Sequence, residues 1–384
     1  MTGAGSRPAD RMTSLSELAW LFLRLGATAF GGPAAHIAMM RREVVEKRAW
    51  LTDEAFLDLV SATNLIPGPS STELAIHIGR ERRGWAGLLV AGVCFIGPAF
   101  LIVLGLAWGY TRYGTLPAVD GVLYGIKPVI IAVIAHALWT LGRTAIKSVW
   151  LGIVGAAALA ATLAGVHELI VLAAAGGLVV IARGVGPRSA PAAWFPWPLL
   201  ATGGASAVVA TISLASIFGV FLKIGAVLFG SGYVLIAFLR SDLVERLQWL
   251  TETQLLDAVA VGQVTPGPVF TTATFIGYLL AGTGGACVAT LGIFLPAFVF
   301  VAITAPIIPK LRSSPLASAL LDGINVASLA LMAAVTYQIA RASLIDAPTI
   351  ALAVIGAVLL IRWKISSMWL VLAGGLAGAL LALR

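Results

Sequence analysis

Long apolar stretches separated by short polar connections fill most of the chain, and this pattern predicts a bundle of membrane-spanning helices. Runs near the roughly 20 residues that cross a bilayer recur along the sequence. They are Leu88–Tyr110, Val119–Leu141, Val149–Gly165, Leu169–Ala182, Leu199–Phe221, Cys287–Ile308, Leu316–Ala340, Ile350–Ile361 and Met368–Leu383. Several are short or merge with their neighbours, so we expect roughly ten to twelve helical segments in an all-α integral membrane protein.

The polar interruptions occur twice in the same order. Pro67-Gly68-Pro69 and Pro266-Gly267-Pro268 both interrupt apolar runs, and subtracting 67 from 266 gives an offset of 199 residues. The same offset aligns Trp50-Leu51-Thr52 with Trp249-Leu250-Thr251. The chain is therefore a tandem duplication. We place the two homologous repeats at residues 13–182 and 199–384, with a linker rich in Pro and Trp at residues 183–198.

Basic residues are distributed unequally between corresponding loops. The loop Arg80–Arg83 is basic whereas its counterpart Leu279–Gly282 carries no charge, and the bias reverses later at Lys310 and Arg312. Because cytoplasmic loops are enriched in Lys and Arg, equivalent loops would lie on opposite sides, which predicts inverted repeats. The segment Asp53–Gly79 is too short for two crossings of about 20 residues each. We therefore expect re-entrant helical hairpins with a Pro-Gly-Pro at each tip.

Composition agrees with a membrane location and excludes some classes of function. The 384 residues are 59% hydrophobic and 11% charged, with a mean hydropathy of +0.98, whereas soluble domains carry about 25% charged residues. The net charge of +8 is spread over short clusters between apolar runs, so we expect no nucleic-acid partner. Neither the two cysteines nor the four histidines show metal-ligand spacing, and we expect no metal or cofactor.

The two Pro-Gly-Pro segments predict an anion site at membrane depth. Proline ends one helix and suits the start of the next, so Pro69 and Pro268 are expected at the first position of an outgoing half-helix. The first N–H groups of that half-helix are free and lie at the positive end of its dipole, a setting that binds oxyanions. The substrate contacts predicted on this basis are Pro67, Gly68, Pro69, Ser70, Ser71 and Thr72 in the first repeat and Pro266, Gly267, Pro268, Thr271 and Thr272 in the second.

Arg24 and Lys223 occupy matching positions within apolar helices. A cation at the bilayer centre costs roughly 2.5–3.5 kcal/mol on insertion scales, so it usually faces a partner or a cavity. We predict that both contact a dianionic substrate, with snorkelling or an ion pair as alternatives. Glu73 could pair with Arg24, but its counterpart Thr272 leaves Lys223 without an equivalent partner. Glu73 would otherwise carry a coupling proton.

Further polar residues recur in register. Asn64 and Gln263 precede the two breaks, and their amides could bind the ligand or cap the incoming half-helix. Asp58 and Asp257 are expected to orient the hairpins, and Lys127 could line the transport path.

Several spaced motifs resemble the chromate transporter family. They are FGGPAAHIAMMRREVV (Phe30–Val45), WLTDEAFLDLV (Trp50–Val60), NLIPGPSSTELAIHIG (Asn64–Gly79), FLKIGAVLFGSGYVLI (Phe221–Ile236) and TPGP (Thr265–Pro268). The resemblance covers roughly Leu15 to Arg341, and it is to the long members of the family, which carry two such domains.

The resemblance implies a protein of the bacterial inner membrane that exports chromate, with sulfate as a related oxyanion. It also implies that the membrane potential or the proton gradient drives transport. By similarity, the Gly-Gly breaks at Gly31, Gly32 and Gly230 belong to the functional core together with the Pro-Gly-Pro segments.

The residues themselves leave other functions open. An importer of sulfate, or an exchanger of another anion, would share these features because sequence does not encode direction. A membrane-embedded enzyme would need a clustered nucleophile, paired carboxylates or metal ligands, and no such cluster is visible, so we expect a transporter. The expected partners are a chromate-like or sulfate-like oxyanion and the lipid bilayer, and homodimerisation stays open.

Overall fold

The protein is all-helical, as predicted. The computed structural model describes residues 13–30, 32–114, 117–184, 212–229, 232, 234–304, 314–363 and 365–382. This part of the chain contains 14 α-helices and no strand. The number exceeds the ten to twelve segments expected because the polar connections form short helices of their own. The predicted linker at residues 183–198 lies almost entirely outside the described residues.

The two repeats contain the same helices in the same order. The first comprises α1 (Leu15–Thr28), α2 (Gly32–Arg41) continued as the π-helix η1 (Arg42–Lys47), α3 (Asp53–Thr63), α4 (Ser70–Tyr113), α5 (Pro117–Ala145), α6 (Val149–Leu163) and α7 (Glu168–Ala182). The second comprises α9 (Leu214–Val227), α10 (Leu235–Leu239) continued as the π-helix η5 (Arg240–Arg246), α11 (Glu252–Val264), the 3₁₀ turn η6 (Val269–Thr271), α12 (Thr272–Thr304), α14 (Pro315–Ser343), α15 (Ala347–Trp363) and α16 (Ser367–Ala382).

The apolar helices identify a multi-pass membrane protein. Four helical stretches within the described residues are long and apolar enough to cross a membrane, namely Ser70–Tyr113, Asp120–Ala145, Val269–Thr304 and Pro315–Ser343. Shorter apolar helices accompany them in both repeats. Large hydrophobic side chains cover the outside, and Trp20, Trp139 and Trp369 are each more than 60% exposed. Such a surface suits lipid and not water.

Each Pro-Gly-Pro joins two helical arms whose starts are specified locally. Thr52 caps α3 by accepting the N–H of Ala55 at 3.2 Å. Thr251 caps α11 in the same way and forms a capping box with Gln254. These threonines are the last residues of the repeated Trp-Leu-Thr motif, so the motif recurs because both hairpins need a helix start at this point.

Both long helices are divided into a short arm and a long arm. The chain reverses at Gly84 and Gly282, whose φ angles of +59° and +60° are readily adopted only by glycine. The short arm from Ser70 to Arg82 is about 20 Å long, less than the roughly 30 Å hydrocarbon core. Arg82 Nη1 donates to the carbonyl of Trp50 at 3.1 Å. The first hairpin, α3 with the short arm of α4, therefore returns to the side from which it started.

The second hairpin, α11 with η6 and the short arm of α12, enters from the opposite side. The short arm of α4 runs from the tip, where Gly68 faces Ala297, to Arg80, which donates to the carbonyl of Val301 at 2.7 Å. The end of α12 therefore runs toward the base of the first hairpin. The long arm of α4 starts at that base and runs away from it. The two long arms are antiparallel, which confirms that the repeats are inverted.

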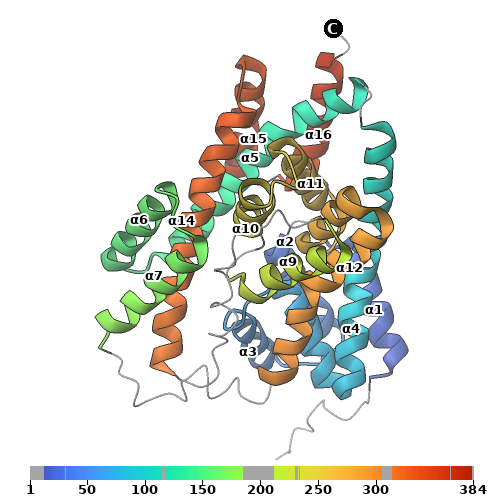
Figure 1. Ribbon diagram of the computed structural model, residues 1–384. Helices are drawn as coiled ribbons and strands as arrows, with labels where there is room; N and C mark the ends of the chain where they lie inside the picture. The colour runs from blue at the N-terminus through green and yellow to red at the C-terminus, as the bar shows by residue number, and fades with distance from the viewer. Residues whose placement is uncertain are drawn as a thin grey trace, which may run out of the picture.

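The later helices of each repeat pack against the other repeat. In Figure 1, α6 and α7 lie along α14, and α15 and α16 lie along α5. Matching polar contacts stabilise this packing between the repeats, since Lys147 donates to Asp322 at 2.8 Å and Tyr124 donates to Asp346 at 2.6 Å. Contacts between the repeats thus occur twice, as in the self-complementary interface of a two-fold dimer. The two repeats form one unit.

Candidate functional site

The two Pro-Gly-Pro tips meet between the repeats, and each is held by the opposite repeat. The N–H of Gly68 donates to the carbonyl of Leu228 at 2.8 Å, and the N–H of Gly267 donates to the carbonyl of Ala29 at 2.9 Å. Ala29 and Leu228 follow α1 and α9 at matching positions. Each hairpin tip is therefore fixed to the helix break of the other repeat, by the same bond made twice.

A small cavity lies between the tips. Its lining consists of Pro33, Pro69, Ser70, Ser71, Gly232, Pro268, Val269 and Phe270. These residues form four pairs at the 199-residue offset, so both repeats contribute the same positions. About 10 Å³ of the cavity is open to the centre of a water molecule, which is about the room that one water needs. A tetrahedral oxyanion requires the cavity to widen.

Helix N-termini converge on this cavity. α4 begins at Ser70, η6 begins at Val269, and Pro33 stands in the first turn of α2. The carbonyl of Pro69 accepts the N–H groups of the third and fourth residues of α4 at 2.7 and 3.0 Å. The N–H groups of Ser70 and Ser71 have no backbone acceptor among the described residues. Free amides and the positive ends of helix dipoles are features that favour an anion over a cation at such a place.

The two sides of the cavity differ chemically. On the first side the lining serines are followed by Thr72, whose buried hydroxyl has no hydrogen-bond partner among the described residues. On the second side Val269 and Phe270 replace the serines. The hydroxyls of Thr271 and Thr272 donate to carbonyls of their own turn at 2.8 Å. Hydroxyl donors for a ligand are thus concentrated in the first repeat.

Arg24 and Lys223 lie outside the cavity lining and are paired with carboxylates. Arg24 Nη2 lies 2.6 Å from Glu43 Oε2, and Lys223 Nζ lies 2.8 Å from Asp242 Oδ1. Both carboxylates are buried and occupy matching positions in η1 and η5. The expectation that Lys223 lacks an equivalent partner is therefore wrong, and so is the pairing of Arg24 with Glu73. Substrate contact by the two cations stays a prediction.

A sequence signal for these partners was present. Glu43 and Asp242 are both acidic and stand 199 residues apart, as the two tips do. They lie in the polar connections, however, and only the π-helical turn that follows α2 or α10 brings them back beside α1 or α9. Pro33 and Gly232, which line the cavity, were not predicted as site residues from the sequence either.

The remaining predicted residues take different places. Asn64 is exposed and donates to the carbonyl of Val60 at 3.2 Å, so it caps α3. Gln263 is buried, and its Nε2 has no partner within the described residues, but it does not line the cavity. Pro69 and Pro268 stand one residue earlier than expected, at the N-cap, because their ψ angles of 90° and 129° are extended.

The glycine breaks are described only in part. Gly31 and Gly230 lie outside the described residues. Gly32 begins α2 with a φ of +76°. Pro67 and Pro266 precede the tip glycines and are not among the residues that line the cavity.

A buried polar cluster ties the second hairpin to the first repeat. Asp257 on α11 accepts the hydroxyl of Tyr110 at 2.7 Å, and Lys127 Nζ lies 3.0 Å from its other oxygen. Asp257 therefore helps to orient its hairpin, as the sequence suggests. Lys127 is held in this ion pair and does not line the cavity.

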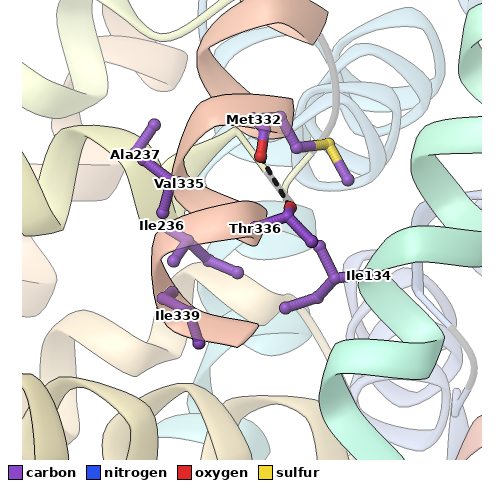
Figure 2. Close-up of a pocket in the computed structure, with 7 residues that line it drawn as sticks. All are labelled: Ile134, Ile236, Ala237, Met332, Val335, Thr336 and Ile339. Carbon is purple, nitrogen blue, oxygen red and sulfur yellow. Dashed lines mark hydrogen bonds between the residues drawn. The ribbon is translucent and has the colours of Figure 1, made fainter. Parts of the chain in front are cut away.

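A second hollow lies between α5, α10 and α14, and its chemistry does not suit an anion. Figure 2 shows that its lining is apolar except for one hydroxyl, that of Thr336, which donates to the carbonyl of Met332 at 2.6 Å. The other lining residues are Ile134, Ile236, Ala237, Val335 and Ile339. The hollow offers neither a charge nor a free donor.

Comparison with known proteins agrees with the motifs. The sequence profile of the chromate transporter family matches residues 16–181 and again residues 215–379. The chain belongs to the chromate transporter family. A chromate transport protein of Cupriavidus metallidurans is 35% identical over 380 residues, which is 97% of this chain and 94% of the relative. A probable chromate transport protein of Synechococcus elongatus is 34% identical over 365 residues, covering 92% of this chain and 91% of the relative.

Shorter relatives correspond to about one repeat. An uncharacterized transporter of Bacillus subtilis is 31% identical over 158 residues, which is 39% of this chain and 89% of that protein. No solved structure matches the chain. In this member of the chromate transporter family, the cavity lining comes from the motif segments Phe30–Val45, Asn64–Gly79, Phe221–Ile236 and Thr265–Pro268, together with the two residues that follow the last of them. The family motifs and the geometry therefore indicate the same place.

Proposed function

We propose that the protein moves a divalent tetrahedral oxyanion across the bacterial inner membrane, with chromate as the principal substrate. The observation that carries the proposal is the convergence of helix N-termini from both inverted repeats on one cavity. Free amides and the hydroxyls of Ser70 and Ser71 can each donate to an oxygen of such an anion. Sulfate has the same charge and shape, so it is the alternative substrate.

Transport follows alternating access. The two hairpins enter from opposite sides and touch at their tips, and the cavity between them is too small for the anion in this conformation. Rocking of one repeat against the other would open the cavity to one side at a time. The basic residues Arg80, Arg82 and Arg83 at the base of the first hairpin indicate that this hairpin opens toward the cytoplasm.

The membrane potential is sufficient to drive export. A potential of 100 mV, negative inside, contributes about 2.3 kcal/mol for each charge moved. Export of a dianion is therefore favoured by about 4.6 kcal/mol. This free energy can maintain an outside concentration about 2,000 times the inside concentration. We propose export on this basis, because an importer would have to move the dianion against the same membrane potential.

Flux of radiolabelled chromate into proteoliposomes under an imposed potential tests the proposal, with unlabelled sulfate as competitor. Ser70→Ala and Ser71→Ala each remove a hydrogen bond to a charged ligand, worth about 1.5–3 kcal/mol, so KM should rise about 10-fold to 100-fold. Ser61→Ala is the control, because Ser61 does not line the cavity and its hydroxyl donates to the carbonyl of Leu57. Absence of chromate flux, or an unchanged KM in both serine variants, contradicts the proposal.

A further inference from the structure

Glu73 is a buried carboxyl group beside the tip of the first hairpin. Its side chain is fully buried, and neither carboxyl oxygen has a hydrogen-bond partner among the described residues. A side-chain carbon placed on Gly68 would collide with Glu73 Oε1. The carboxyl therefore lies against the Pro-Gly-Pro tip, in the first turn of the half-helix whose N-terminus lines the cavity.

No cation on the neighbouring elements is available to neutralise this carboxyl. The ionisable side chains on the elements packed against α4 are Glu17 and Arg24 on α1, His36 and Arg41 on α2, Asp53, Glu54 and Asp58 on α3, Glu252 and Asp257 on α11, and Tyr278 and Cys287 on α12. Arg24 pairs with Glu43, Arg41 pairs with Glu46 and Asp53, and His36 Nε2 contacts the carbonyl of Ala29 at 3.0 Å.

The nearest ionisable groups on α4 itself do not compensate either. His77 stands one turn beyond Glu73, and its buried Nε2 has no hydrogen-bond partner within the described residues. Arg80 donates to the carbonyls of Val301 and Ala302. An isolated carboxylate in such a place is strongly disfavoured by the loss of hydration. In this conformation the Glu73 carboxyl is therefore held in its neutral form, with one proton bound.

The position of this proton links it to the anion. A charged Glu73 in the first turn of α4 would repel a dianion bound at Ser70 and Ser71, whereas a protonated Glu73 would not. Proton and anion therefore favour each other's binding. The matching position in the second repeat is Thr272, whose hydroxyl does not ionise and donates to a carbonyl of its own turn. The site accordingly holds one proton and not two.

We propose that Glu73 is a proton-binding site and that one proton accompanies each oxyanion in the same direction. This inference rests on the proposed function. Export would then move one net negative charge per cycle, so the membrane potential would still drive it. An acidic exterior would oppose export.

The test uses the full protein in proteoliposomes with the voltage clamped to zero and a pH difference of one unit imposed. Radiolabelled chromate is the probe, in alkaline buffers where the anion carries both charges, and a pH-sensitive dye reports proton movement. The wild type should accumulate chromate about tenfold in the more alkaline compartment. One pH unit is a tenfold difference in proton concentration, and with one proton moved per anion it is balanced by a tenfold difference in chromate concentration in the opposite direction. Glu73→Gln should abolish this accumulation and the proton flux that accompanies chromate.

Glu81→Gln is the matched control, since Glu81 lies on the same helix but is exposed, and it should accumulate chromate as the wild type does. Chromate flux in the wild type without accumulation overturns the inference. This result comes from the wild type alone, so it does not depend on whether a variant folds. Accumulation that persists in Glu73→Gln also overturns the inference, because the transported proton is then bound by His77 or by the anion itself. Absence of any chromate or sulfate flux in the wild type under voltage instead refutes the proposed function.

Discussion

Replacement of Gly267 by alanine should separate the second hairpin tip from the first repeat. Gly267 has a φ of +87°, which an alanine adopts only with strain of about 1–3 kcal/mol. The new Cβ would lie 2.7 Å from the Cβ of Ala99 and 3.0 Å from the carbonyl oxygen of Gly26. Neither neighbour is a flexible side chain, so crowding adds about 1–3 kcal/mol. We expect a total loss of about 2–6 kcal/mol in stability.

Gly282 offers a matched control for the backbone term. Its φ is +60°, but a Cβ added there meets no atom within 4 Å. Gly282→Ala should therefore lose only the backbone strain of an alanine at φ +60° and ψ −150°, about 1–3 kcal/mol. The difference between the two variants isolates the contact between the tip and the opposite repeat.

Thermal unfolding of both variants, purified in the same detergent, provides the measurement. Gly267→Ala should have a clearly lower apparent melting temperature than Gly282→Ala, and chromate flux in vesicles should fall more because the reciprocal hydrogen bond to Ala29 is disturbed. Equal melting temperatures in the two variants, with equal flux, would refute the packing of the tip against the first repeat.

Three further outcomes follow from the polar contacts. Lys223→Met should lower stability because it removes one of the two cations paired with the buried Asp242, the other being Arg246. Adding Asp242→Asn should restore part of the loss by removing the buried charge; full chromate transport by the double variant would show that Lys223 does not contact the substrate. Tyr110→Phe should lower stability by about 1.5–3 kcal/mol through loss of its bond to Asp257, and an unchanged melting temperature would contradict this. Burial alone would raise the pKa of Glu43, but hydrogen bonds from three neighbouring cations hold it at about 2, below its usual 4.5. The stability from these bonds is present above pH 4.5 and is lost as the pH falls toward 2, so the melting temperature of the wild type should fall over that range more steeply than that of Glu43→Gln.

Much of the architecture could be predicted because it depends on local or repeated features. Apolar runs long enough to span a bilayer, and prolines that cannot continue a helix, act wherever they occur in the chain. The 199-residue offset between Gly68 and Gly267 revealed the duplication, and the charge difference between Arg80–Arg83 and its counterpart predicted inversion. Each of these can be read from neighbouring residues or from a comparison of the two halves.

The pairing of charges could not be predicted in the same way. Glu73 is close to the first tip in sequence and was the obvious partner for Arg24, but the π-helical turn η1 brings Glu43 to Arg24 instead. The equivalent turn η5 supplies Asp242 to Lys223. A partner 19 residues away depends on how the intervening chain folds back, and short-range patterns do not encode that path.

By itself, the sequence determined that this protein is a duplicated membrane helical bundle with two matched breaks, because proline, glycine and apolar length act locally. Only the tertiary structure decided that each tip bonds the opposite repeat and that one side of the cavity offers hydroxyls that the other does not. It also decided that Glu73 has no hydrogen-bond partner within the part of the chain that the structure describes. The physical reason is that a hydrogen-bond donor is satisfied by whichever acceptor the fold brings within about 3 Å. For Gly68 that acceptor is the carbonyl of Leu228, in the other half of the chain.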